Sequence, residues 1–392
     1  MNDITILCKV VDNFGDIGFV YRLARRFSEI ATNKHLNIIV DNLYAFNLLC
    51  PEIFAQNDNP QKLGNWTIFD WNDSTNCTSY FQKNFPQIIL ECFQCGRPNW
   101  LENILFPPKK SNKDHENTPN PICQIINIDY LTAENYAETF HRLQSLTRNV
   151  FVKKINFMPG FTNKTAGLIL DNNFLLCKKK HSQNKLKKHF RLLIFTYKKN
   201  FMPILYSLNS FSSSCGKIVE ISVAQGNGQK KFFFDAHIFF QSTKNTNPSQ
   251  IQITELPFLK QTEWDNNLFT FDFLFIRGED SLSRAVLSGI PFIWHAYEQD
   301  EDYQLIKVQA LLEKMQPFFK PDDFVFLSNL WIQFNTSLTH INEKEISANL
   351  FYILKNLDSY KHGFNSFADH IQKIGDFGEH LLTFIEECKI FS

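Results

Sequence analysis

Phe275-Ile-Arg-Gly-Glu-Asp-Ser281 marks a point where a strand ends and a helix begins. The apolar run 269–276 predicts the strand, and the stretch 282–288 predicts a short helix. Gly289 follows as a typical helix-ending residue, and 291–297 has the composition of the next buried strand. The segment is therefore predicted to be a β-α-β unit, which makes an open α/β sheet the expected fold of this part of the chain.

The strand-to-helix corner of this unit carries an arginine, two carboxylates, a glycine and a serine. The N-terminus of a helix presents backbone N–H groups and the positive end of its dipole, so such a corner can hold an anion. The same residues also fit a plain turn at Gly278 with Asp280 or Ser281 as the helix cap. The local sequence leaves both interpretations open.

Length and composition set the broad class of the protein. At 392 residues the chain exceeds the usual size of one domain, so two domains are expected. Hydrophobic residues make up 44% and charged residues 20%, which is typical of globular proteins. Lys+Arg 40 against Asp+Glu 40 leaves no net charge, so we expect no nucleic-acid partner.

Targeting and redox signals point to a cytoplasmic protein without a membrane segment. The N-terminal residues 1–7 lead straight into a strand and lack the features of a signal peptide, and no apolar stretch reaches membrane-spanning length. Nine scattered cysteines favour reduced thiols. Cys92 and Cys95 form a CxxC pair, but a metal or redox site needs further ligands nearby, so we expect two thiols at the end of a buried strand.

A second corner lies near the N-terminus. The apolar run 4–11 predicts a strand, Asp12-Asn-Phe-Gly-Asp-Ile-Gly18 a glycine-containing loop, and 19–30 an amphipathic helix. The loop lacks the G-x-G-x-x-G of a dinucleotide site, and its carboxylates would repel a diphosphate. At the carboxyl end of a strand they are placed to face a cation or a hydroxyl. A helix cap and a turn aspartate remain the alternative.

The rest of the chain alternates short apolar runs with helical segments, as α/β proteins do. The basic run 178–188 predicts a linker, since such runs are usually solvated. We therefore predict an N-terminal domain over 1–183, completed by a C-terminal helix over 366–392, and a second domain over 184–365. The aromatic-rich stretch 232–240 is predicted to be a strand.

Asp300-x-Asp302 resembles the metal-binding DxD of some sugar-nucleotide enzymes. Acids in the first turn of a helix are ordinary partners of the helix dipole, so we assign no metal to this pair.

Several motifs in a fixed order resemble the EarP family, the bacterial protein-arginine rhamnosyltransferases that act on elongation factor P. The motifs are Asp12-Asn-Phe-Gly-Asp-Ile-Gly18 with Arg22-Leu-Ala-Arg25, 126–134, Met158-Pro-Gly-Phe-Thr162 with Ala166-Gly-Leu168, 256–261, Phe275-Ile-Arg-Gly-Glu-Asp-Ser281 and Tyr297-x-Gln299. The resemblance covers nearly the whole chain. The chain departs from the family pattern at Asp129, at His141-Arg-Leu143 and at Glu298.

This resemblance implies a GT-B glycosyltransferase with two Rossmann-like domains that face each other across a cleft. It implies inverting transfer of L-rhamnose from dTDP-β-L-rhamnose to the guanidine of one arginine of elongation factor P, which activates that factor for rescue of ribosomes stalled at polyproline. No metal or other cofactor is implied, and the partners are elongation factor P and dTDP-rhamnose.

The resemblance also assigns roles to individual residues. It implies catalytic roles for Asp12, Asp16 and Glu279, and the two aspartates would face the acceptor. Phe14 and Gly15 would shape the acceptor side of the site and would also contact the donor. In the second domain it implies that Phe195 and Tyr197 flank the thymine and that Gln261 lies near the nucleotide. Arg277, Glu279, Asp280 and Ser281 would hold the ribose and the diphosphate.

The expected chemistry sets a limit on what a carboxylate can do. An ordinary carboxyl group has a pKa of about 4 and a guanidinium above about 12.5, so complete deprotonation before attack would cost roughly 11 kcal/mol. We therefore expect Asp12 and Asp16 to grip the guanidinium, disturb its planarity and take its proton as the new C–N bond forms. Arg277 and the helix starting near Ser281 would stabilise the departing dTDP.

Other functions stay open on the sequence alone. A GT-B enzyme could use another nucleotide-sugar and a lipid or polysaccharide acceptor, and a non-catalytic nucleotide-sugar-binding module would use Asp12 and Asp16 as turn and cap residues. A nicotinamide oxidoreductase lacks its glycine fingerprint in this chain.

Overall fold

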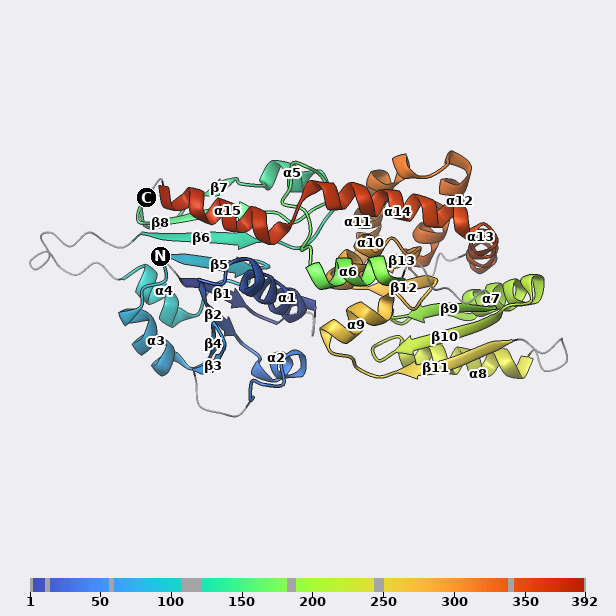
Figure 1. Cartoon of the computed structure of the whole chain (residues 1–392), viewed down its shortest axis with the longest axis horizontal. Coiled ribbons are helices and arrows are strands. Elements are labelled where there is room, and N and C mark those ends of the chain that lie inside the picture. Colours follow the sequence, from blue (N-terminus) through green and yellow to red (C-terminus); the bar gives the residue numbers. More distant parts are fainter. Residues whose placement is uncertain are drawn as a thin grey trace, which may run out of the picture. The chain divides into compact units, whose positions relative to one another are not determined.

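The computed structural model describes residues 3–10, 15–55, 60–107, 122–181, 188–242, 250–337 and 342–390. The chain divides into two compact units (Figure 1). Unit 1 comprises Met1–Leu131, Asn135–Leu170 and Ile374–Ser392, and unit 2 comprises Thr132–Glu134 and Asp171–Lys373.

Unit 1 is built on a largely parallel sheet in the order β3-β4-β2-β1-β5-β6-β8-β7. Only the short edge strands β3 and β7 pair antiparallel. The strands are β1 (Asp3–Cys8), β2 (His35–Val40), β3 (Gln61–Leu63), β4 (Trp66–Asp70), β5 (Ile88–Cys92), β6 (Cys123–Ile128), β7 (Gln144–Ser145) and β8 (Val152–Phe157).

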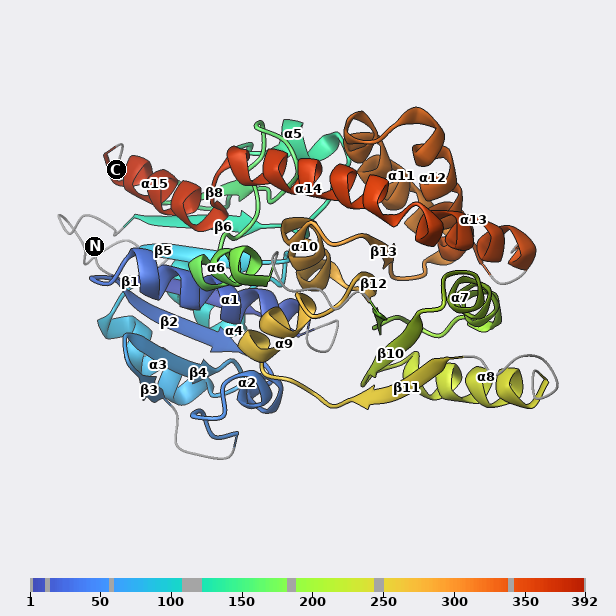
Figure 2. The same ribbon diagram turned by 45° about the vertical axis from the view of Figure 1, so that its right-hand side comes forward.

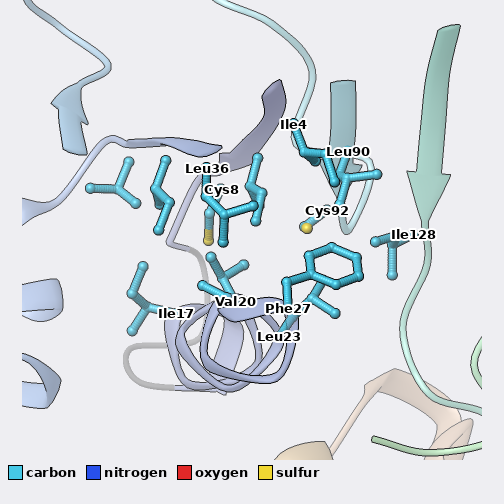
Figure 3. Close-up of a cluster of buried hydrophobic side chains, with 14 of the residues drawn as sticks. Ile4, Cys8, Ile17, Val20, Leu23, Phe27, Leu36, Leu90, Cys92 and Ile128 are labelled. Carbon is cyan, nitrogen blue, oxygen red and sulfur yellow. The ribbon is translucent and has the colours of Figure 1, made fainter. Parts of the chain in front are cut away.

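The sheet of unit 1 has an apolar core on each face because side chains alternate along its strands. On β1, Ile4, Ile6 and Cys8 enter one core and Leu7 enters the other. The first core takes its helical side chains from α1 (Gly15–Ile30), α2 (Leu43–Leu49) and α15 (Phe377–Ile390), and Figure 3 shows α1 directing Val20, Leu23 and Phe27 at the sheet. The second core is covered by α3 (Ser74–Lys83) and α4 (Asn99–Leu105), whereas α5 (Tyr136–Phe140) precedes β7.

Unit 2 contains a fully parallel sheet in the order β11-β10-β9-β12-β13. Its strands are β9 (His189–Ile194), β10 (Ile218–Ala224), β11 (Ile251–Leu256), β12 (Phe273–Arg277) and β13 (Phe292–His295). Its helices are α6 (Asn172–His181), α7 (Met202–Cys215), α8 (Gln229–Ser242), α9 (Gln261–Leu268), α10 (Glu279–Ser288), α11 (Gln304–Met315), α12 (Pro321–Asn335), α13 (Glu343–Lys355) and α14 (Leu357–Ile374). Helices α7 and α8 pack against β10, whereas α10 packs against β12 (Figure 2).

The prediction of a strand over 232–240 is wrong, because these residues form most of helix α8. The residues of α8 that are buried are Phe232, Asp235, Ala236 and Phe239, which recur at the three- and four-residue spacing of one helix face. The strand propensity of phenylalanine concealed this spacing, and tertiary packing decided the outcome.

The predicted α/β class is confirmed, and both sheets have Rossmann-like strand order. Taken in chain order, the parallel strands of unit 2 lie as 3-2-1-4-5 and those of unit 1 as 3-2-1-4-5-6. In such sheets ligands bind beyond the carboxyl ends of the strands, where the strand order reverses. That point lies between β9 and β12 in unit 2 and between β1 and β5 in unit 1.

Candidate functional site

Strand register brings the two predicted donor motifs of unit 2 together. Phe275 pairs with Ile194, and the N–H of Phe195 donates to the carbonyl of Phe275 at 2.8 Å. The residues that follow β9 therefore run beside the end of β12, where Arg277 stands. On the other side Arg277 is in register with His295 of β13. The predicted residues Phe195, Tyr197 and Arg277 thus meet at the switch point of this sheet.

The Arg277 guanidinium lies against two aromatic rings. Its Cζ is 4.8 Å from the ring centroid of Phe195 and 4.7 Å from that of Tyr197. Its Nε is buried and has no hydrogen-bond partner among the described residues. No carboxylate of the residues that the structure describes forms an ion pair with Arg277. Its positive charge is therefore not neutralised by any of them.

The helix after Arg277 begins at a glycine. Gly278 is the N-cap of α10 with φ 73°, a conformation that favours glycine, and the first helical hydrogen bond runs from the N–H of Leu282 to the carbonyl of Gly278. Asp280 and Ser281 are the second and third residues of the helix, so the interpretation of either as its N-cap is wrong. Their backbone N–H groups belong to the helix N-terminus, where an anion is favoured.

Two further residues predicted to bind the donor, Glu279 and Gln261, are the first residues of helices α10 and α9. Glu279 forms a 4.0 Å ion pair with Lys307 of α11, and its side chain is 26% exposed. Gln261 is the first residue of α9 and is buried. The motif reasoning placed both near the nucleotide, and in the structure both stand at helix N-termini of unit 2.

Sequence reasoning missed two buried groups, His295, which pairs with Arg277 across the strands, and Lys199, whose charge lies near His295. The His295 ring lies 5.4 Å from the Tyr197 ring and 4.9 Å from that of Phe334, and its buried Nδ1 has no hydrogen-bond partner among the described residues. Burial, with the nearby charges of Lys199 and Arg277, lowers the pKa of His295 to about 3. Lys199 donates to the carbonyl of Thr336, and burial lowers the pKa of its ammonium group. The available signal was their position in the sequence, because His295 is the last residue of β13 and Lys199 follows β9.

Two glycines after β10, Gly226 and Gly228, were also not predicted to belong to the site. A Cβ on Gly228 would lie 2.6 Å from the carbonyl oxygen of Thr196 and 2.7 Å from that of Tyr197, so only glycine allows this close approach. A Cβ on Gly226 would lie 3.3 Å from Nη2 of Arg277. The loop between them therefore forms one wall of the Arg277 site.

In unit 1, part of the predicted acceptor site can be placed. Gly15 and Asp16 open helix α1, and Asp16 is buried, with 2% of its surface exposed. The pKa values of the Cys8 and Cys92 thiols are raised by burial first and also by the negative charge of Asp16, which puts this carboxylate near the ends of β1 and β5. Asp12 and Phe14 lie outside the described residues.

The turn after β5 has an unusual backbone. Phe93 and Gln94 have φ values of 59° and 52°, which non-glycine residues rarely adopt. Phe93 stacks on Tyr130 at a centroid distance of 4.6 Å, and Gln94 donates to Asp129 at 2.8 Å. Such strain often marks functional positions, and here it lies at the switch point of unit 1. The sequence did not predict this turn, because left-handed turns usually contain glycine and these two positions do not.

The described residues provide no metal cluster of three or more His, Cys, Asp or Glu side chains. Asp302 instead accepts hydrogen bonds from Ser337 N at 3.1 Å and from Gln304 Nε2 at 2.9 Å, as a local structural residue does. Among the helices that can be described, none is long and apolar enough to cross a membrane.

Comparison with known proteins agrees with these features. Residues 4–386 match the model of the family described as elongation factor P (EF-P) rhamnosyltransferase EarP. A protein-arginine rhamnosyltransferase of Shewanella oneidensis is 28% identical over 358 residues, covering 84% of each chain. One from Neisseria meningitidis serogroup B is 28% identical over 335 residues, covering 81% of this chain and 80% of the relative.

Solved structures show the same architecture. A structure described as the basis for EarP-mediated arginine glycosylation of translation elongation factor EF-P matches with a TM-score of 0.58 and 17% identity, covering 98% of this chain and 99% of that one. A UDP-GlcNAc 2-epimerase from Neisseria meningitidis, bound to UDP-GlcNAc, matches with a TM-score of 0.55 and 10% identity, covering 99% and 100%. The predicted GT-B fold with two Rossmann-like domains is confirmed. With the family model spanning nearly the whole chain, the protein belongs to the EarP family of elongation factor P rhamnosyltransferases and is a glycosyltransferase.

Proposed function

We propose that this enzyme transfers L-rhamnose from dTDP-β-L-rhamnose to the guanidine of an arginine of elongation factor P, with inversion at the anomeric carbon. The observation that carries the proposal is the Arg277 guanidinium, which stands at the switch point of unit 2 without a carboxylate partner among the described residues. Membership of the EarP family supports the choice of rhamnose as the sugar, of arginine as the acceptor residue and of elongation factor P as the protein substrate.

The donor is assigned to unit 2. When the bond between the sugar and the diphosphate breaks, negative charge grows on dTDP and must be met by fixed positive groups. Arg277 and the N-terminus of α10, with Asp280 and Ser281 in its first turn, would meet that charge. Gln261 and Glu279 would bind hydroxyl groups of the nucleotide or sugar, and Phe195 and Tyr197 complete the pocket.

The acceptor is assigned to the acidic loop of unit 1. A guanidine nitrogen attacks the anomeric carbon from the face opposite dTDP, so the C–N bond forms as the C–O bond to the diphosphate breaks. The nitrogen loses one proton in this step, and Asp16, together with Asp12, would take it as the bond forms. The burial of Asp16 supports this role, because a carboxylate shielded from water interacts more strongly with a guanidinium.

The proposal uses no metal or other cofactor, because Arg277 and the helix N-terminus would supply the positive charge that metal ions supply in other glycosyltransferases. We place the reaction in the cytoplasm, where elongation factor P acts on ribosomes, and expect the product to support translation through polyproline.

Mass spectrometry of the intact acceptor tests the proposal. Elongation factor P is incubated with the full-length protein and dTDP-β-L-rhamnose. A gain of one deoxyhexose, abolished when the acceptor arginine is changed to lysine, is the expected result. A gain that survives that change, or a gain only with another nucleotide-sugar, would refute the assignment of acceptor or donor respectively.

A further inference from the structure

The aromatic residues beside Arg277 suggest a role that differs from contact with the base. We propose that Phe195 and Tyr197 are positioning residues that hold the Arg277 guanidinium ready for the donor diphosphate, and that this accounts for most of their contribution to donor binding. The inference rests on the proposed function in one respect, the assignment of Arg277 to the diphosphate.

The first argument is the pair of ring contacts itself. Arg277 Cζ lies within 5 Å of both ring centroids, at 4.8 Å from Phe195 and 4.7 Å from Tyr197, distances at which a cation is attracted by the ring face. The guanidinium therefore occupies one face of each ring. A base could stack on that face only after Arg277 had moved away.

The second argument is that the rings hold the guanidinium in place of a carboxylate. An arginine side chain is long and flexible, and a carboxylate paired with both of its terminal nitrogens is one way to fix it. Arg277 forms no such ion pair with any described residue, and its buried Nε has no hydrogen-bond partner there. A carboxylate would fix the guanidinium but cancel its charge, whereas aromatic faces fix it and leave the charge available for an anion.

The third argument is that the two rings are themselves held in place. Trp264 packs edge-on against Phe195 at 4.9 Å, and Tyr297 packs edge-on against Tyr197 at 5.5 Å. His295 also contacts the Tyr197 ring at 5.4 Å. Because burial and the nearby cations keep His295 neutral at ordinary pH, it supports Tyr197 without adding a charge that would compete with Arg277.

Calorimetry with a charged and an uncharged ligand separates positioning from base stacking. The variants are Tyr197→Leu and Phe195→Leu, with Tyr197→Phe as the conservative control, each in the full-length protein and checked for folding by circular dichroism. We expect each leucine variant to bind dTDP about tenfold more weakly. Thymidine binding, followed by saturation-transfer NMR, should stay within about twofold of wild type, and Tyr197→Phe should bind dTDP like wild type.

A double-mutant cycle makes the test sharper. In an Arg277→Met background, Tyr197→Leu should cause no further loss of dTDP affinity, because the group it positions is gone. A parallel fall of thymidine and dTDP affinity, or an undiminished effect of Tyr197→Leu in the Arg277→Met background, would overturn the inference. If the leucine variants do not fold, Phe195→Met and Tyr197→Met, each alone and combined with Arg277→Met, remove the ring faces at similar side-chain size and provide the same comparison.

Failure of the proposed function would look different. Wild-type protein that binds inorganic pyrophosphate or another nucleoside diphosphate but not dTDP would contradict the donor assignment, and the variants would then test the positioning role with that ligand. Wild-type protein that binds none of these anions would overturn both proposals.

Discussion

Arg26 of helix α1 and Asp376 form a buried ion pair that ties the last part of the chain to the first. The distance from Nε to Oδ2 is 2.7 Å, and both side chains are at most 5% exposed. Asp376 also accepts the N–H of Leu170 at 2.8 Å and lies directly before α15. Unit 1 is thus held together by two residues that lie 350 positions apart in the sequence.

Removing one partner of this pair should destabilise unit 1. Asp376→Ala leaves the Arg26 charge buried with weaker partners, and we expect a loss of about 3 kcal/mol in the free energy of unfolding, measured by urea denaturation. Glu387→Gln on the following helix α15 breaks an exposed pair with Arg142 and should cost less than about 1 kcal/mol. Equal effects of the two changes would argue against a special role of the buried pair.

Replacing Asp16 by Asn should lower turnover and spare donor binding. The variant keeps the shape of the side chain but cannot accept the proton, so we expect kcat to fall roughly 100-fold or more, with dTDP-rhamnose affinity nearly unchanged. Steady-state kinetics and calorimetry on the same preparation measure both quantities. Loss of donor binding in this variant would contradict the assignment of Asp16 to the acceptor.

Replacing Arg277 by Ala should have the opposite pattern. The variant loses the cation that faces the diphosphate, and dTDP affinity should fall about 10- to 100-fold. Calorimetry with dTDP provides the measurement, and Lys307→Ala, which removes the cation paired with Glu279, is a neighbouring control. Unchanged affinity in the Arg277 variant would refute its role.

Acid should destabilise the protein through two histidines, the buried His295 and the half-buried His141. Burial lowers the pKa of His295 to about 3 and that of His141 to about 4, whereas an unfolded histidine titrates near about 6.5. Between about pH 6.5 and 4 the unfolded chain therefore binds protons that the folded chain does not. Stability is fully present above about pH 6.5 and falls as the pH is lowered.

Urea denaturation at a series of pH values measures this effect. The free energy of unfolding should decrease from pH 7 to pH 5, and His141→Gln or His295→Gln should make the decrease shallower. A slope that neither variant changes would mean that other groups are responsible.

The CxxC pair should be chemically inert in the folded protein. Burial raises the pKa of Cys95 to about 12 and that of Cys92 well above its ordinary value, so neither forms a thiolate at pH 8. Iodoacetamide labelling read by mass spectrometry should modify the exposed Cys215 first. Labelling of Cys92 or Cys95 as fast as Cys215 would revive a redox role for the pair.

The sequence alone determined the α/β class and both strand-to-helix corners. The apolar run before Arg277, the glycine at 278 and the helical stretch after it are local signals, because strand and helix periodicity and turn chemistry act over a few residues. The family motifs were readable for the same reason. The strand predicted over 232–240 failed because phenylalanine's preference for strands conflicted with a helical spacing of buried residues.

Only the tertiary structure decided how these local pieces meet. Nothing in the sequence places Phe195 and Tyr197 against Arg277, because that contact follows from the parallel register of β9 and β12, set by hydrogen bonds between segments far apart in the chain. Burial of His295 and the return of α15 to α1 depend likewise on packing over long sequence separations. Local sequence signals identified the candidate donor-binding residues, and the topology of the sheet brought them into contact.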